Sequence, residues 1–275
     1  MIYATVTVSL ALDQPNEARL QVAGELAERF EASIVGVAAA QFTPPLYFAD
    51  RAEAQGLIDQ EQASIRKRLA DLKAQFRAGT RARGGHAQRR SAMDFPTRFV
   101  LAQLRCAEIV VSGEHSPAFS DAFSLASPKD LVMQAGRPLL IVPDGVHWLD
   151  LRSVLIAWKD TPEARRAVAD ALPMLKATDI TIVEIPEHGD GGQAAMARIT
   201  DVAAWLRRHR RCDRALPGSR GERNSRAQLK KIADDVGAGL IVAGAYGHSR
   251  FRELIFGGVT QYLATQSARC VLLSR

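Results

Sequence analysis

The stretch RSVLIAWKDTPEARRAVADAL, residues 152–172, changes from a short apolar run to the spacing of an amphipathic helix. The apolar run 152–158 predicts a strand. Thr161 then has the character of a helix N-cap, with Pro162 in the first turn. A strand followed directly by a helix is the repeating unit of α/β proteins, so this stretch predicts a parallel sheet covered by helices.

The same pattern recurs in the first half of the chain. NEARLQVAGEL (16–26) matches PEARRAVADAL (162–172), AEIVVSG (107–113) matches AGLIVAG (238–244), and PLLIV (138–142) matches CVLLS (270–274). The offsets are 146, 131 and 132 residues, which indicates a duplicated unit rather than an array of short repeats. We expect two domains, 1–145 and 151–275, separated by the short polar linker DGVHWLD (144–150).

Hydrophobic periodicity and turn residues divide both halves into alternating strands and helices. Strands are expected at 4–10, 32–40, 86–92, 107–113, 138–143, 152–158, 179–186, 212–216, 239–245 and 270–274. Helices are expected at 16–31, 50–78, 95–105, 128–134, from 162 onward, 193–210, 222–236 and 258–267.

The composition is that of an ordinary soluble protein, with 47% hydrophobic and 24% charged residues. No apolar run approaches the roughly 18 residues that a membrane span needs, and the N-terminus has no signal-peptide pattern. Cys106, Cys212 and Cys270 are far apart, so we expect small buried side chains and no disulfide framework. These features together predict a cytoplasmic protein.

The net charge of +6 is unevenly distributed. Residues 1–150 carry 16 Lys and Arg against 17 Asp and Glu, whereas residues 151–275 carry 20 against 13. A basic half favours an anionic ligand. The run RRHRRCDR (207–214) has no interleaved aromatic residues, which disfavours nucleic acid and is typical of a solvated helix end.

A glycine-rich segment, GAYGHSRFRELIFGGVT (244–260), follows the apolar strand 239–245. Glycines let backbone N–H groups approach phosphate oxygens, and a helix N-terminus after Gly257 and Gly258 would favour an anion. His248, Ser249, Arg250 and Arg252 would add donors and positive charge. From spacing alone, a phosphate site and a set of plain turns both remain open.

The chain resembles tandem universal stress proteins, whose nucleotide-binding members carry G-x2-G-x9-G-[S/T] after the fourth strand. The match here is Gly244, Gly247 and Gly257, together with SVLIAWKDTPEARRAV upstream and CVLLS downstream. The resemblance implies an α/β fold of two flavodoxin-like, doubly wound units, each with a five-stranded, mostly parallel sheet, arranged as a pseudo-dimer. It also implies ATP or a related adenine nucleotide, with or without Mg²⁺, as the ligand. The site residues that it implies are Ala157, Trp158, Lys159, Asp160, Ile185, Gly244, Gly247, His248, Ser249, Arg250, Gly257, Gly258, Val259 and Thr260.

Two positions depart from the family pattern. Lys159 stands where the family has Asp, with Asp160 one place late, and Gly258 replaces the usual hydroxyl residue. Loss of one hydrogen bond to a charged group costs about 1.5–3 kcal/mol, so a tenfold loss of affinity or more is expected. Lys159 either pairs with a phosphate or points into solvent.

The first half keeps Gly113 but lacks the rest of the glycine pattern. Ser116 stands at the place of Gly247, and Glu114, Asp121 and Asp130 would repel a polyphosphate. We therefore expect the first half to bind no ATP by the family's route and to serve as the built-in dimer partner of the second half.

These observations favour a stress-response sensor or regulator that binds an adenine nucleotide in its second half and hydrolyses it slowly at most. No catalytic residue and no metal site stand out, because the six histidines lack ligand spacing. The alternative is a nucleotide-free protein-interaction module, with residues 50–78 as its docking element. A protein partner and a homodimer remain open as assemblies; no membrane partner is expected.

Overall fold

The computed structural model describes residues 3–42, 51–80, 86–114, 123–176, 178–184, 192–209, 214–217, 225–245, 262–263 and 268–275. We use "N-terminal unit" for the elements up to β5 and "C-terminal unit" for those from β6 onward. The N-terminal unit contains β1 (Thr5–Ser9), α1 (Glu17–Phe30), β2 (Ser33–Ala39), α2 (Arg51–Thr80), β3 (Ala87–Ala92), α3 (Pro96–Gln103), η2 (Leu104–Cys106), β4 (Ile109–Gly113), α4 (Pro128–Gln134) and β5 (Leu139–Val142).

The C-terminal unit repeats this order. It contains β6 (Ser153–Trp158), α5 (Pro162–Ala171), β7 (Asp179–Glu184), α6 (Gly192–His209), β8 (Arg214–Pro217), α7 (Ser225–Asp235), β9 (Leu240–Gly244) and β10 (Cys270–Ser274). The expected strands and helices are thus confirmed within a few residues, except that the helix expected at 258–267 lies mostly outside the described residues. The helix expected at 95–105 ends as a 3-10 turn, where Cys106 is exposed; the expectation of a buried side chain is wrong for Cys106 and confirmed for Cys270.

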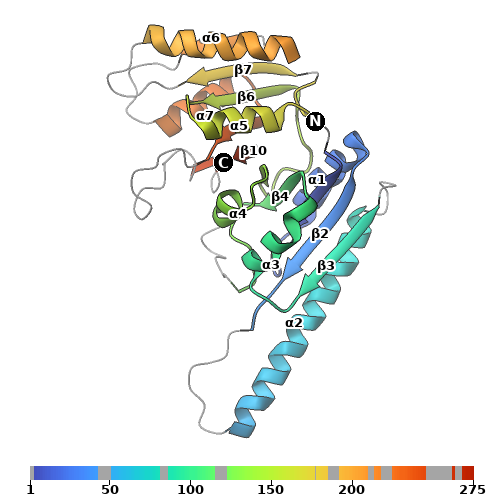
Figure 1. The fold of residues 1–275 in the computed structure, drawn as a ribbon. Coiled ribbons are helices and arrows are strands. Elements are labelled where there is room, and N and C mark those ends of the chain that lie inside the picture. The colour runs from blue at the N-terminus through green and yellow to red at the C-terminus, as the bar shows by residue number, and fades with distance from the viewer. Residues whose placement is uncertain are drawn as a thin grey trace.

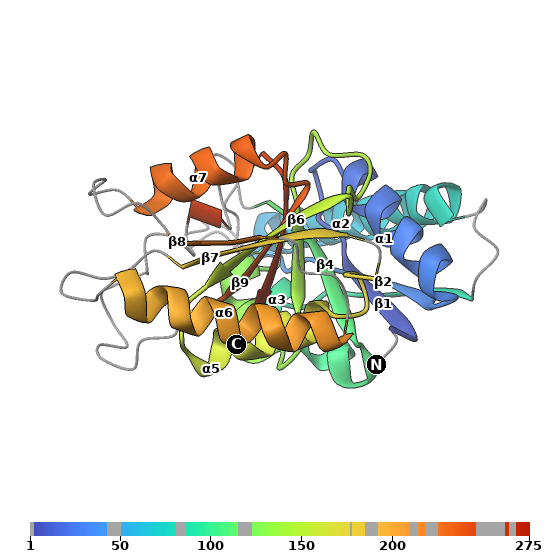
Figure 2. The same ribbon diagram turned by 90° about the horizontal axis from the view of Figure 1, so that it is seen from above.

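The ten strands of the described residues lie in one sheet, in the order β3-β2-β1-β4-β5-β10-β9-β6-β7-β8. Every neighbouring pair is parallel except β5 and β10, which run antiparallel in the middle, with Leu272 opposite Leu140. Each unit therefore contributes five parallel strands in the same order, and the antiparallel pair joins them about a pseudo-twofold axis. Figures 1 and 2 show the two units as successive parts of one twisted sheet.

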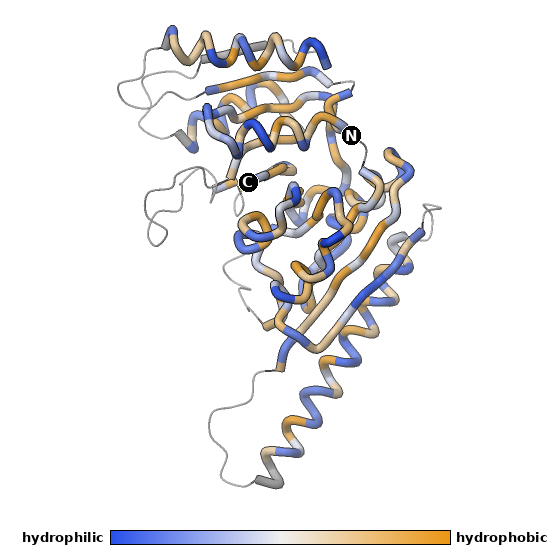
Figure 3. The backbone as a smooth tube through the Cα atoms, in the orientation of Figure 1, coloured by the Kyte–Doolittle hydropathy of each residue, from blue (hydrophilic) through white to orange (hydrophobic). Residues whose placement is uncertain are grey.

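Helices cover both faces of this sheet, as a parallel sheet requires. On one face, apolar side chains of α1, α2, α5 and α6 pack against the strands; on the other, those of α3, α4 and α7 do so. The hydropathy colouring in Figure 3 shows the strands as mostly apolar, with polar residues on the outer faces of the helices. None of the helices in the described part of the chain is long and apolar enough to cross a membrane.

Two further features are the connection between the two units and the long helix α2. The connection between β5 and β6 is held against α1, because Glu25 accepts a hydrogen bond from the backbone N–H of Leu149, and Leu149 and Leu151 are buried. Helix α2 packs on the sheet through Ile65, Leu69 and the buried apolar residues later in the helix. Its N-terminal half projects beyond the sheet (Figure 1).

Candidate nucleotide site

The candidate site lies where β6 and β9 end side by side at the carboxyl edge of the C-terminal unit. The two strands are paired in register up to Ala157 and Ala243, and α5 begins at this edge. Thr161 caps α5, since its Oγ1 accepts a hydrogen bond of 3.3 Å from the backbone N–H of Ala164. Open α/β sheets bind ligands at this edge, where strand order reverses, and the helix start adds a positive dipole end.

Gly244 ends β9 against the first turn of α5. A Cβ atom on Gly244 would lie 2.5 Å from the backbone nitrogen of Ala164 and 2.7 Å from the carbonyl carbon of Glu163. No side chain fits there, so the helix start lies directly on the strand end. The first glycine of the segment therefore has a packing role that the sequence did not reveal.

Four of the predicted residues lie at the end of β6 or just after it, and they differ in burial, direction and partners. Trp158 is 8% exposed, and its indole Nε1–H is buried with no hydrogen-bond partner within the described residues. Ala157 packs toward the opposite face of the sheet, as strand alternation requires. Lys159 is half-buried, whereas Asp160 is exposed and pairs with Arg165 at 2.6 Å. The orphaned indole donor marks a polar position at this edge.

The structure brings together Ala157, Trp158, Lys159, Asp160 and Gly244. The remaining predicted residues lie outside the described residues: Ile185, Gly247, His248, Ser249, Arg250, Gly257, Gly258, Val259 and Thr260. The roles predicted for them stay predictions.

Sequence reasoning missed an ion pair beside Trp158. Glu184 ends β7 in register with Trp158 and is 5% exposed. Its carboxylate accepts hydrogen bonds from Arg198 of α6: Oε1 from Nε at 2.9 Å and from Nη2 at 2.6 Å, and Oε2 from Nε at 3.2 Å. The signal was present in the sequence, because a Glu that closes the apolar strand DITIVE requires a partner when it is buried.

The equivalent edge of the N-terminal unit is filled by the protein itself. Arg19 aligns with Arg165 at the offset of 146 residues, but it turns inward and is 1% exposed. Its Nη1 lies 3.4 Å from the carbonyl oxygen of Ser9, and its Nη2 lies 3.9 Å from Asp144. The guanidinium packs on Gly113, the counterpart of Gly244.

Burial dominates the electrostatics of this filled edge. It lowers the pKa of Arg19 to about 10, although Asp144 acts in the opposite direction. Burial also raises the pKa of Glu114, and the charge of Asp144 adds to that effect. One acidic residue of this edge, Asp144, therefore lies beside an internal cation. Among the side chains that the structure describes, no three His, Cys, Asp or Glu residues gather as a metal site would require.

The universal stress protein family model matches residues 151–275. The C-terminal unit is a universal stress protein domain. No curated protein matches the chain significantly. A universal stress protein from Archaeoglobus fulgidus DSM 4304 is similar in structure to the whole chain, with a TM-score of 0.69 and 14% identity over 98% of this chain and 96% of that one.

Two proteins from Pseudomonas aeruginosa are also similar across the chain. One, from strain PAO1, has no known function and gives a TM-score of 0.56 at 13% identity, covering 99% of this chain and 92% of that one. The other, a putative universal stress protein from UCBPP-PA14, gives 0.53 at 12% identity, covering 99% and 93%. These likenesses show the fold alone: two flavodoxin-like α/β units in one chain.

Proposed function

We propose that the universal stress protein domain of this chain binds ATP or a related adenine nucleotide and acts as a sensor or regulator in the stress response. The observation that carries the proposal is the difference between the two edges. In the C-terminal unit the start of α5 lies on Gly244, and the nearby Trp158 donor has no partner among the described residues, whereas Arg19 packs on the equivalent glycine of the N-terminal unit. We take the C-terminal edge, where the backbone of α5 rather than a buried arginine lies on the strand end, as the edge that binds the ligand.

The sequence supplies the rest of the argument. The glycine segment begins at Gly244, at the end of β9, and continues with Gly247, Gly257 and Gly258. Backbone N–H groups of such a segment would bind phosphates, and Arg250 or Lys159 would add positive charge. The basic excess of residues 151–275 favours the same anionic ligand.

Any ATPase activity should be slow. The described edge offers three carboxylates: Asp160 is paired with Arg165, Glu184 is paired with Arg198, and Glu163 lies at the start of α5. We therefore propose a binding protein whose ligand state, rather than a rapid reaction, carries the signal.

The test is calorimetric titration of the full chain with ATP and Mg²⁺, together with mass spectrometry of any ligand that copurifies. Gly247→Val and Gly257→Val should each weaken binding at least tenfold, since a branched side chain blocks the approach of backbone N–H groups. Gly145→Val is the matched control, because Gly145 has open space around its Cβ position. Absence of binding to the wild-type chain would refute the proposal and favour the interaction module.

A further inference from the structure

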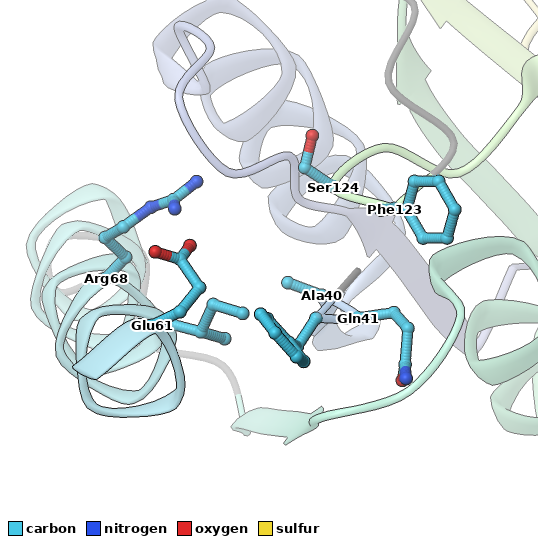
Figure 4. A pocket seen from close by; sticks show the side chains of 8 residues that line it. Ala40, Gln41, Glu61, Arg68, Phe123 and Ser124 are labelled. Atoms are coloured by element: carbon cyan, nitrogen blue, oxygen red, sulfur yellow. The ribbon is translucent and has the colours of Figure 1, made fainter. Parts of the chain in front are cut away.

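A small pocket opens in the N-terminal unit, at the carboxyl end of β2. Its volume is about 190 Å³, and it is lined by Ala40, Gln41, Phe42, Glu61, Ile65, Arg68, Phe123 and Ser124. Three of these, Glu61, Ile65 and Arg68, come from one face of α2, at spacings of four and three residues (Figure 4). The volume is below the roughly 300–1,000 Å³ of pockets for drug-sized ligands, so a small molecule would fit.

The walls of the pocket are fixed from several sides. The backbone N–H of Gln41 donates to the carbonyl oxygen of Phe123 at 2.8 Å, which joins the end of β2 to the segment before α4. Arg68 forms an ion pair with Asp13 in the loop after β1, which holds α2 against that loop. The pocket is therefore bounded by elements that contact one another directly.

The lining combines opposite charges with an apolar surface. Figure 4 shows Glu61 and Arg68 extending from α2 toward the same opening, with Ser124 and Phe123 across it. Ile65 is buried at the base, and Phe42 and Phe123 supply aromatic surface. The Nε–H of Arg68 is buried and has no hydrogen-bond partner among the residues described, although a guanidinium has five donors to satisfy.

We propose that this pocket binds a free apolar α-amino acid. The ligand's carboxylate would accept hydrogen bonds from Arg68, its ammonium group would donate to Glu61, and its side chain would lie against Phe42, Ile65 and Phe123. A simple anion would meet the charge of Glu61 and a simple cation that of Arg68, so a zwitterion fits best. A polyphosphate would face both Glu61 and Asp13.

The ligand series tests this on the wild-type chain. Calorimetry with L-phenylalanine should give a dissociation constant on the order of 0.1–1 mM, as expected for a ligand of this size. 3-Phenylpropionate lacks the ammonium group and phenethylamine lacks the carboxylate, so each should bind about tenfold more weakly or worse. Equal binding of all three compounds, or no binding up to about 10 mM, would overturn the proposal.

Two variants test the contributions of the two charged side chains to binding separately. Arg68→Met should weaken L-phenylalanine and 3-phenylpropionate but not phenethylamine. Glu61→Gln should weaken L-phenylalanine and phenethylamine but not 3-phenylpropionate. Glu61 is exposed, so this second variant keeps the test intact if loss of the Asp13 ion pair unfolds the first. Loss of binding that does not follow this crossed pattern contradicts the assignment.

Matched controls lie on the same helix. Arg66 and Asp59 are exposed, and neither lines the pocket, so Arg66→Met and Asp59→Asn should leave every affinity unchanged. Competition between ATP and L-phenylalanine would indicate a nucleotide in this pocket and overturn the proposal. Binding of L-phenylalanine by a chain that binds no ATP would refute the proposed function and leave this inference standing.

Discussion

Arg19 packs its guanidinium on Gly113. A Cβ atom on Gly113 would lie 2.9 Å from Nε of Arg19 and closer still to Cζ and Nη2. The pair closes the carboxyl edge of the N-terminal unit, at the place where the C-terminal unit has Gly244 and the start of α5. One edge is therefore closed by a side chain, and the other by a backbone contact.

Gly113→Ala should destabilise the chain by about 1–3 kcal/mol, because the added methyl group overlaps a buried side chain. In the Arg19→Ala background most of that cost should disappear, because the atoms it meets are gone. Urea unfolding of the four chains of this double-mutant cycle measures the coupling. Additive costs would show that the methyl group meets something other than Arg19.

Gly244→Ala should behave differently. Its Cβ would meet backbone atoms of Glu163 and Ala164, which no side-chain rotation can move. We expect a loss of at least about 2–3 kcal/mol, with no relief from Arg165→Ala, the counterpart of Arg19→Ala. The same unfolding experiment measures it, and relief by Arg165→Ala would contradict the geometry.

Removing only one partner of the ion pair of Glu184 and Arg198 should lower the stability of the chain more than removing both. Arg198→Met leaves the buried carboxylate of Glu184 uncompensated, at an expected cost of about 3 kcal/mol. The double variant Glu184→Met with Arg198→Met should recover most of that loss, since it removes both charges. Chemical unfolding of the wild-type chain and these two variants checks this; a double variant that is no more stable than Arg198→Met would contradict it.

Stability should fall in alkaline solution. Burial raises the pKa of the Cys270 thiol to about 12 from its usual value near 9, and burial also raises that of the Tyr3 phenol. A raised folded-state pKa stabilises the protein below the unfolded-state pKa, and this stabilisation is lost as the pH rises through the folded value. The wild-type chain should therefore lose roughly 1.4 kcal/mol per pH unit above about 9 from Cys270 alone.

Cys270→Ala is the variant for this measurement. It should be less stable than wild type at pH 7 because of the lost packing, yet its stability should fall less steeply between about pH 9 and 11. Cys106→Ala is the matched control, because the side chain of Cys106 is exposed. An unchanged slope in Cys270→Ala would contradict the burial argument.

The sequence predicted the order of strands and helices well, because each element combines strong periodicity with clear turn residues. Thr161 and Pro162 marked the start of α5 correctly, and Thr161 Oγ1 caps it. The duplication also predicted matching sheets. Local patterns of this kind depend on neighbours in the chain, which the sequence displays directly.

Contacts between distant residues were harder to predict. Nothing in the repeat distinguishes Arg19, which turns inward, from Arg165, which turns outward to Asp160. The fourth strand of each unit ends in a glycine here, Gly113 or Gly244, so the strand itself does not account for the difference. The pair of Glu184 and Arg198 and the pocket beside α2 depend on the packing of helices on the sheet.

The antiparallel pairing of β5 with β10 affects how the contact between the two units depends on protein concentration. In a dimer of separate units such a seam forms only when two chains meet, whereas here a short connection holds the two strands at an effective concentration on the order of millimolar or above. The seam is therefore insensitive to dilution. A substitution also enters one side of it at a time, so the carboxyl edges of the two units can differ, as they do where Arg19 is buried on Gly113 and α5 lies on Gly244.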